Sequence, residues 1–180
     1  MHEIFTKRRS VRHYQKKGVE EEKLKEILKA AMSGPSGHNS RIWEFVVVGD
    51  HKTKEKLAES GPWADFVKEA PVVIVIVGDE KKSKLWLEDC SIAAGYIYLE
   101  AANQGLGTCW VHIHEGKTLD GRDPEDFVRE LLGIPHEKRI LCLLPIGYPE
   151  DEVWDCRPIS FIKENMIQFV YVSCPRQTNC

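Results

Sequence analysis

The feature that most restricts the fold is a run of six β-branched residues at positions 72–77, which follows Pro71. Alternate side chains of a strand point to opposite faces, so a strand made only of valine and isoleucine is apolar on both faces. Such a strand is buried on both sides, and helices supply that cover in most sheets of this kind. The run therefore predicts a central sheet with a helical layer on each face.

Helices and strands alternate along the rest of the chain. Apolar residues recur at helical spacing over residues 19–32 and predict an amphipathic helix. Helices are also expected over residues 51–60 and 123–133, the second beginning at an Asp-Pro pair and ending at a glycine. Strand character marks four further segments, residues 44–48, 108–113, 139–146 and 167–172. The order indicates an α+β fold, a helix-sheet-helix sandwich with a mixed central sheet.

A long helix is expected over residues 85–104, and it is apolar nearly all round, with small residues at positions 93–95. A helix without a polar face must be covered on every side. A chain of 180 residues has little material left to bury it completely, so we expect a dimer interface here. Residues 1–166 form the expected domain, and residues 167–180 form a strand and tail that can pack on the partner subunit.

The composition excludes several classes of function. The formal net charge is −3, so no basic excess favours nucleic acid or an anionic membrane surface. The longest wholly apolar run, residues 72–77, is too short to cross a bilayer. The N-terminal residues lack the apolar stretch of a secretory signal, so we expect a cytoplasmic protein. The six cysteines include no CxxC pair, which favours reduced thiols over structural zinc.

Three segments have residues suited to ligand binding, and the first lies near the N-terminus. Arg8, Arg9, Ser10 and Arg12 place three guanidinium groups and a hydroxyl within five residues. Arginine presents forked donors that match phosphate oxygens, and serine adds a short donor. These residues predict a phosphate site. The alternative is a solvated basic segment.

The other two segments are turns. Residues 35–41 form a loop dense in donors and acceptors that can reach the polar edge of a heterocycle, or that simply connects a helix to a strand. Residues 105–107 read Gly-Leu-Gly at a helix-to-strand turn. The glycines of a dinucleotide-binding fold lie at a strand-to-helix turn, so that kind of site is rejected. A tight turn with close backbone contacts is the alternative.

No catalytic side chain and no metal site is predicted. His112 and His114 share one face of the expected strand, as two metal ligands would, but no third ligand has suitable spacing. Cys109 lacks a base that would make it a nucleophile. Glu88 and Asp89 are interpreted as acids in the first turn of a helix, where the helix dipole favours them.

These segments, in this order, resemble the motifs of the nitroreductase family of FMN enzymes. The similar motifs are RRSxRxF at residues 8–14, the PSxxNxQPW loop at residues 35–43, the central helix and GLG-x-x-W strand at residues 88–94 and 105–110, and the closing strand and late arginine at residues 145–149 and 157–159. The resemblance extends from residue 2 to about residue 163.

The resemblance implies a homodimer with two non-covalent FMN sites at the subunit interface. In such a site, Arg8, Ser10 and Arg157 would hold the phosphate and ribityl chain, with Arg9 beside them. Two arginines can neutralise a phosphomonoester dianion through charge-assisted hydrogen bonds. Arg12 would lie near the pyrimidine edge of the flavin, where a positive charge stabilises the anionic reduced form.

The resemblance also implies contacts at the flavin ring. The other subunit would contribute the loop residues Pro35, Ser36, Gly37 and Asn39. His112 and Ile113 would lie against the N5 side of the ring, where backbone groups orient it. Two departures from the family pattern occur there. Arg41-Ile42 stands in place of the usual Gln-Pro, and Ile113 stands where glycine is common.

The implied activity is that of an FMN-dependent oxidoreductase. Hydride passes from NAD(P)H to the flavin and then to a small-molecule acceptor, a nitroaromatic, a quinone or a related compound, in a ping-pong sequence. The cofactor carries the chemistry, so no protein nucleophile is required. Two alternatives stay open, a specialised reductase of the same fold such as a flavin-dependent dehalogenase, and a flavin-binding module without turnover.

Overall fold

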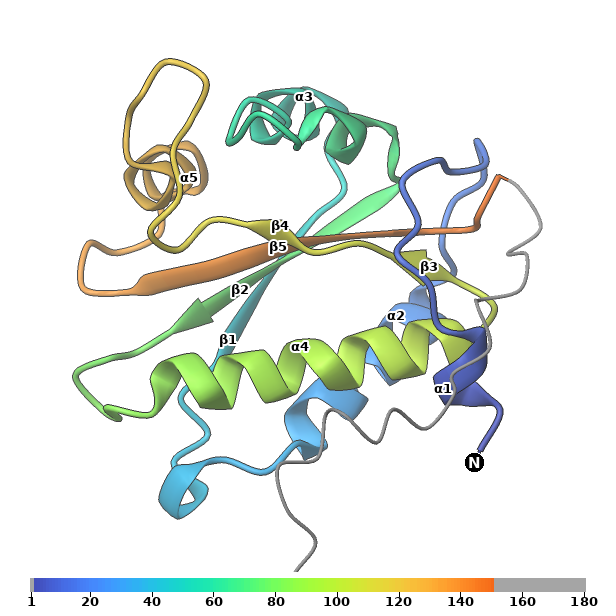
Figure 1. The fold of residues 1–180 in the computed structure, drawn as a ribbon, viewed down its shortest axis with the longest axis horizontal. Coiled ribbons are helices and arrows are strands. Elements are labelled where there is room, and N and C mark those ends of the chain that lie inside the picture. Colours follow the sequence, from blue (N-terminus) through green and yellow to red (C-terminus); the bar gives the residue numbers. More distant parts are fainter. Residues whose placement is uncertain (1, 151–180) are drawn as a thin grey trace, which may run out of the picture.

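The computed structural model describes residues 2–150, which form helices on both sides of a five-stranded sheet (Figure 1). The α-helices are α1 (Ile4–Lys7), α2 (Glu21–Ser33), α3 (His51–Leu57), α4 (Trp86–Asn103) and α5 (Pro124–Leu132). Two 3-10 helices are η1 (Gly37–Asn39) and η2 (Asp65–Glu69). The strands are β1 (Glu44–Val48), β2 (Val72–Gly78), β3 (Gly107–Thr108), β4 (Val111–His112) and β5 (Arg139–Gly147).

The strands follow the order β1-β2-β5-β3, and β4 also pairs with β5. Every pairing between these strands is antiparallel. The N-terminal segment adds a parallel bridge between Ser10 and Thr108, so the sheet is mixed at this edge. The predicted fold class, a helix-sheet-helix sandwich, is confirmed.

Strand β2 is buried on both faces, as its composition predicts. Ile74 and Ile76 belong to the core under α2 and α4, while Val73, Val75 and Val77 belong to the core under α3 and α5. Figure 1 shows these two pairs of helices on opposite sides of the sheet. The period-2 alternation of a β-strand thus sends one continuous apolar run into two separate cores.

The boundaries of α5 lie close to the predicted ones because a side chain satisfies free amides at its start. The Asp123 carboxylate accepts hydrogen bonds from the Glu125 amide at 2.7 Å and from the Asp126 amide at 3.2 Å, which begins α5. Gly133, at φ 65°, ends α5 in the left-handed conformation that glycine adopts without strain. Helix α2 ends at Ser33, next to the Gly-Pro pair that predicts its end.

The predicted single strand over residues 108–113 is wrong, because β3 and β4 are separate. The interruption falls at Cys109 and Trp110, where the Trp110 amide donates its hydrogen bond to the Tyr98 hydroxyl of α4 instead of to β5. A side chain from the neighbouring helix therefore replaces one bond of the sheet. The expected strand 167–172 and the domain boundary at residue 166 lie outside the described residues.

Helix α4 has a buried inner face and an outer face that this chain leaves partly open. Cys90, Ala93, Ala94 and Ile97 are fully buried on the inner face. On the outer face, apolar side chains line a shallow hollow of about 550 Å³ with Arg8. No helix among the described residues is long and apolar enough to cross a membrane.

Candidate functional site

The N-terminal segment is fastened to the edge of the sheet. The Val11 amide donates to the Thr108 carbonyl at 3.0 Å, and the Tyr14 hydroxyl donates to the Val11 carbonyl at 2.7 Å. Gly107 permits this approach, since a Cβ there would lie 2.6 Å from the Val11 Cβ. The close backbone contact expected at the Gly-Leu-Gly turn is therefore present, and it positions the predicted phosphate residues.

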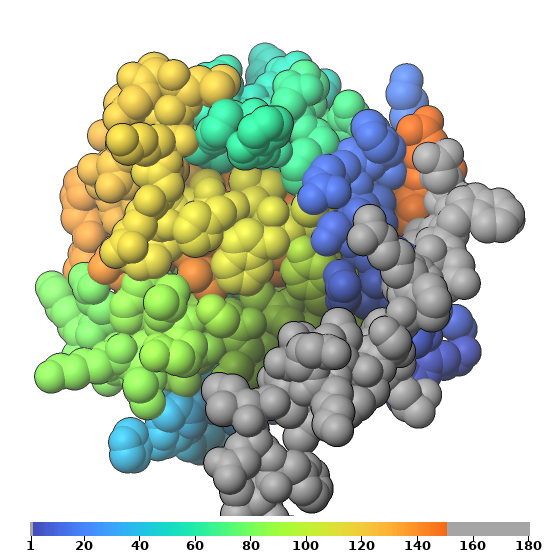
Figure 2. Space-filling model, in the orientation of Figure 1, coloured from blue at the N-terminus to red at the C-terminus, as the bar shows by residue number. Residues whose placement is uncertain are grey.

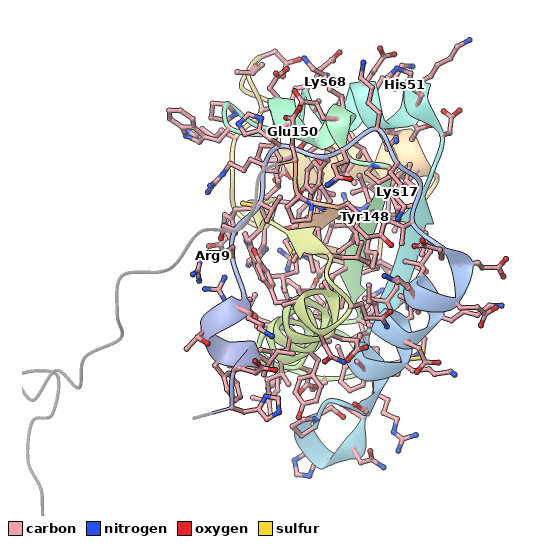
Figure 3. The ribbon with its side chains drawn as sticks, turned by 90° about the vertical axis from the view of Figure 1, so that its right-hand side faces the viewer. Arg9, Lys17, His51, Lys68, Tyr148 and Glu150 are labelled. Carbon is pink, nitrogen blue, oxygen red and sulfur yellow. The ribbon has the colours of Figure 1, made fainter. Side chains whose placement is uncertain are left out.

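The basic strip, defined here as Arg8, Arg9, Ser10 and Arg12, lies along this fastened segment. The Arg8 guanidinium lies 5.6 Å from the Tyr98 ring centroid, and that of Arg12 lies 5.9 Å from the Phe66 ring centroid. One Arg9 nitrogen donates to two backbone carbonyls at 2.9 Å, and Figure 3 shows its side chain at the edge of the molecule. Ser10 and Arg12 are exposed.

The strip retains positive charge for a ligand. Among residues 2–150, no carboxylate forms an ion pair with Arg8 or Arg12. Arg8, without an acidic partner in this range and close in sequence to the exposed Ser10, is a donor that suits a phosphate, and Arg12 adds a second unpaired positive charge. Arg157, the remaining predicted phosphate ligand, lies outside the described residues.

Tyr98 links the basic strip to the segment between β3 and β4, a role that the sequence analysis did not predict. Its hydroxyl accepts the Trp110 amide, and its ring faces the Arg8 guanidinium. The pKa of Tyr98 is raised to about 12, mainly by burial, so the hydroxyl stays protonated. A tyrosine on the inner side of a helix needs a partner for its hydroxyl, and this requirement could have indicated from the sequence that Tyr98 has a structural role.

Cys109 does not have the properties of a nucleophile. Burial raises the pKa of its thiol, and the nearby Arg12 and Ser10 only oppose that effect. Cys90 and Cys142 are also free and buried. The expectation that Cys109 lacks an activating base agrees with this environment.

The loop at residues 35–41 is tied to the beginning of α4 by Asp89. This carboxylate, 2% exposed, accepts the Gly37 amide at 2.8 Å and the Ser40 hydroxyl at 3.2 Å. Arg41 donates to the Asn39 side-chain oxygen at 3.0 Å. The interpretation of Asp89 as a simple first-turn acid was incomplete. Its position beside Cys90, on the buried face of the helix, could have indicated from the sequence that Asp89 has a buried partner.

The loop is held in a costly conformation. His38, Asn39 and Arg41 have φ values of 52°, 55° and 47°, a region that non-glycine residues seldom adopt. Such strain persists only where surrounding contacts impose it, and Asp89 supplies two of those contacts. The side chains of Pro35, His38, Asn39 and Arg41 are exposed, so the loop presents its polar groups outward.

The loop and the basic strip lie at opposite ends of α4. Asp89 holds the loop near the first turn of the helix, and Tyr98 contacts the strip nine residues later. At 1.5 Å per residue, these two anchors are about 13 Å apart along the helix. Figure 1 shows α1 and the loop after α2 at the two ends of α4. In one subunit the loop and the basic strip are thus anchored at different positions along α4.

His112 and Ile113, predicted at the flavin ring, differ in their exposure. Ile113 is fully buried, and its amide donates to the Leu141 carbonyl at 3.2 Å. His112 is exposed and lines a cavity of about 360 Å³ together with Trp110. Of this pair, His112 is the residue with a side chain available to a ligand.

His114 serves a structural cluster and does not form a metal site with His112. Its Nδ1 lies 2.7 Å from the Glu125 carboxylate and 3.1 Å from an Arg139 nitrogen. Within the part of the chain that the structure describes, no three His, Cys, Asp or Glu side chains gather as metal ligands.

Comparisons with known proteins agree with the motifs and the fold. The family model described as the nitroreductase family matches residues 5–64 and 59–148. A protein of Methanothermobacter thermautotrophicus with an NADH dehydrogenase/NAD(P)H nitroreductase name is 38% identical over 152 residues, which cover 83% of this chain and 77% of that protein. An iodotyrosine deiodinase of Thermotoga neapolitana is 29% identical, with 84% of this chain and 89% of that protein covered.

Solved structures give the same result. An FMN-dependent nitroreductase from Clostridium difficile superposes with a TM-score of 0.89 at 36% identity, covering 95% of this chain and 100% of that one. The matches in sequence, motif order and fold cover most of the chain, and on these grounds the protein belongs to the nitroreductase family.

Proposed function

We propose that this chain is an FMN-dependent oxidoreductase that takes hydride from NAD(P)H and reduces a small-molecule acceptor such as a nitroaromatic or a quinone. The observation that carries the proposal is the basic strip, whose Arg8 and Arg12 have no acidic partner among residues 2–150. The names of the relatives, an NAD(P)H nitroreductase and an FMN-dependent nitroreductase among them, support it. A cytoplasmic location, predicted from the sequence, suits an enzyme that uses NAD(P)H.

The described residues fit FMN, which supplies hydride-transfer chemistry when bound. Arg8 and Ser10, with Arg9 beside them, would donate to the phosphate, together with Arg157. Arg12 would place positive charge near the pyrimidine edge. His112 and the backbone around it would orient the ring. These residues bind and orient, and none is assigned a catalytic role.

The site is completed by a second subunit in this proposal. In their own chain, the loop of Pro35, Ser36, Gly37 and Asn39 and the basic strip are anchored about 13 Å apart along α4. The outer face of α4 leaves Ile92 and Tyr96 each 37% exposed. A homodimer packed on this face would cover these apolar side chains and bring the loop to the partner's flavin.

The first test is an FMN titration. Replacing Arg8 with alanine removes one charge-assisted contact to the phosphate, worth about 1.5–3 kcal/mol. We expect the FMN dissociation constant to rise roughly 10- to 150-fold, measured by quenching of flavin fluorescence. The matched control is Arg122→Ala, which removes an exposed arginine that pairs with Asp120 and should leave FMN affinity unchanged. Equal affinity of the Arg8→Ala and wild-type proteins would refute the assignment.

A mixed dimer tests whether two subunits build each site. Subunits with Arg8→Ala and subunits with Asn39→Ala are coexpressed with different tags, and the mixed dimer is purified. If each site takes its strip from one chain and its loop from the other, the mixed dimer contains one intact site and one doubly altered site. We expect half of the sites to bind FMN with wild-type affinity. Two weakened sites, with none at wild-type affinity, would show that strip and loop serve the same subunit's site.

Reductive dehalogenation is a second candidate, favoured by the similarity to iodotyrosine deiodinase. The two activities are separated by supplying the reduced protein with a nitroarene or with an iodophenol and measuring nitro reduction or iodide release. A flavin-binding module without turnover would leave the flavin absorbance unchanged after NADH or NADPH is added.

A further inference from the structure

A cavity of about 360 Å³ lies beside His112, between the turn after α3 and the segment that follows β3. We call it the aromatic cavity, defined by Trp63, Trp110, His112 and Lys117; its other lining residues are small or aliphatic. In Figure 2 the segment of residues 107–117 (yellow) is visible at the surface between α4 and the part of the chain around α3 and η2 (green). The nitroreductase motifs assign no role to Trp63 or Lys117.

Trp63 offers an open aromatic surface. Its side chain is 86% exposed, the highest value among the large apolar residues of the described chain. Trp110 lines the same cavity and is half-buried. Indole rings stack favourably on other flat aromatic rings, in offset or edge-to-face arrangements. The two tryptophans therefore suit a planar aromatic ligand.

His112 adds a directed donor. The Trp110 Nε1–H donates to His112 Nδ1 at 3.4 Å. A neutral imidazole carries its proton on the nitrogen that does not accept, so this contact leaves Nε2–H as a donor. A ligand in the cavity can accept a hydrogen bond from this nitrogen through a carbonyl, nitro or phenolate oxygen.

Lys117 gives the cavity a positive charge. It lines the cavity, no carboxylate lines it with Lys117, and no described residue forms an ion pair with Lys117. The backbone is fixed on both sides of this lysine. The Gly116 amide donates to the Ile113 carbonyl at 3.0 Å, and the Thr118 amide and hydroxyl both donate to the Arg122 carbonyl, at 3.1 and 2.9 Å. The backbone that carries Lys117 is therefore held beside the cavity, and its side chain is exposed.

From these contacts we propose that the aromatic cavity selects a planar aromatic acceptor that carries an anionic group, with the ring between Trp63 and Trp110 and the anion at Lys117. The inference rests on the proposed function, because the cavity adjoins His112, the residue expected at the flavin ring. It names the substrate class of that site, an aromatic carboxylate or phenolate in place of a neutral nitroarene or quinone.

The test compares two ligands that differ in charge. Binding of 4-nitrobenzoate and of 4-nitrobenzamide to the FMN-loaded protein is measured by isothermal titration calorimetry, for the wild type and for Lys117→Gln. We expect the wild type to prefer the carboxylate, and Lys117→Gln to weaken carboxylate binding about 5- to 30-fold while the amide is unaffected. Lys52→Gln, an exposed lysine on α3, is the matched control.

Further variants and ligands separate stacking, charge and dinucleotide binding as explanations of the result. Trp63→Ala should weaken both ligands by a similar factor, because it removes stacking and not charge. Equal binding of the two ligands to the wild type, or no effect of Lys117→Gln, overturns the proposal. If Lys117→Gln binds NADH more weakly but binds nitrobenzoate as the wild type does, the proposal is also overturned, because Lys117 would then contact the dinucleotide phosphates. FMN titration of the same preparations reports separately on the proposed function, and nitrobenzoate titration of the flavin-free chain still reports on the cavity.

Discussion

Replacing Glu125 with alanine is expected to lower the free energy of unfolding by about 3–5 kcal/mol, the cost of breaking a buried charge network by removing one partner. The side chain is 5% exposed and joins three elements. Its carboxylate accepts two hydrogen bonds from Arg139, at 2.9 and 3.0 Å, and one from the Ile140 amide at 3.0 Å. His114 contacts it at 2.7 Å. Without it, a buried amide and two cationic or polar groups lose their acceptor.

The measurement is urea unfolding of the variant and of two comparison proteins. Glu130→Ala removes an exposed glutamate from the same helix and should change stability by no more than about 0.5 kcal/mol. Glu125→Gln keeps the shape and one acceptor, so its loss should fall between the other two. A Glu125→Ala protein as stable as Glu130→Ala would contradict the role assigned to the network.

The same carboxylate predicts how stability depends on pH. Burial by itself raises the pKa of Glu125, but hydrogen bonds from Arg139, from the Ile140 amide and from His114 outweigh burial and lower the pKa to about 2. A carboxylate whose pKa is depressed on folding stabilises the protein above its usual value of 4.5. That contribution is lost as the pH falls from 4.5 towards 2. Glu125→Gln should show a shallower loss of stability across this interval.

Gly107→Ala is expected to abolish tight FMN binding while leaving most of the fold intact. The added Cβ would lie 2.6 Å from the Val11 Cβ, a distance at which one segment must move. Overpacking of this kind costs about 1–3 kcal/mol of stability. Because Val11 lies between Ser10 and Arg12 in the chain, its displacement would shift both of these residues of the basic strip. We expect the FMN dissociation constant to rise roughly 100-fold or more, since several charge-assisted contacts are lost at once.

Two results separate this effect from a general loss of folding. Circular dichroism of Gly107→Ala should remain close to that of the wild type, while the flavin titration changes. Gly49→Ala serves as the matched control, because a Cβ at Gly49 meets no atom within 4 Å. Unchanged FMN affinity in Gly107→Ala would mean that the N-terminal segment does not position the phosphate.

Local sequence patterns were sufficient to predict the helices α2 to α5 and the strands β1, β2 and β5. A valine and isoleucine run predicts a strand buried on both faces whatever surrounds it, and β2 is such a strand. An Asp-Pro pair predicts a helix start because the cap bonds only residues two and three positions later. The guanidinium groups near the N-terminus indicate an anion site because their charge does not depend on the fold.

Contacts between distant segments were decided only in the tertiary structure. Asp89 holds the loop 52 residues before it, and Tyr98 interrupts a strand by accepting one amide. Neither partner can be chosen from local pattern, because a carboxylate or a hydroxyl bonds whichever donor packing brings to it. Helix α4 likewise separates the loop from the basic strip, because Asp89 and Tyr98, which contact them, lie nine residues apart along it. The sequence by itself indicated which groups are chemically suited to FMN, while the packing of α4 against its neighbours decided where each group stands, since burial and hydrogen-bond partners arise only when the segments meet.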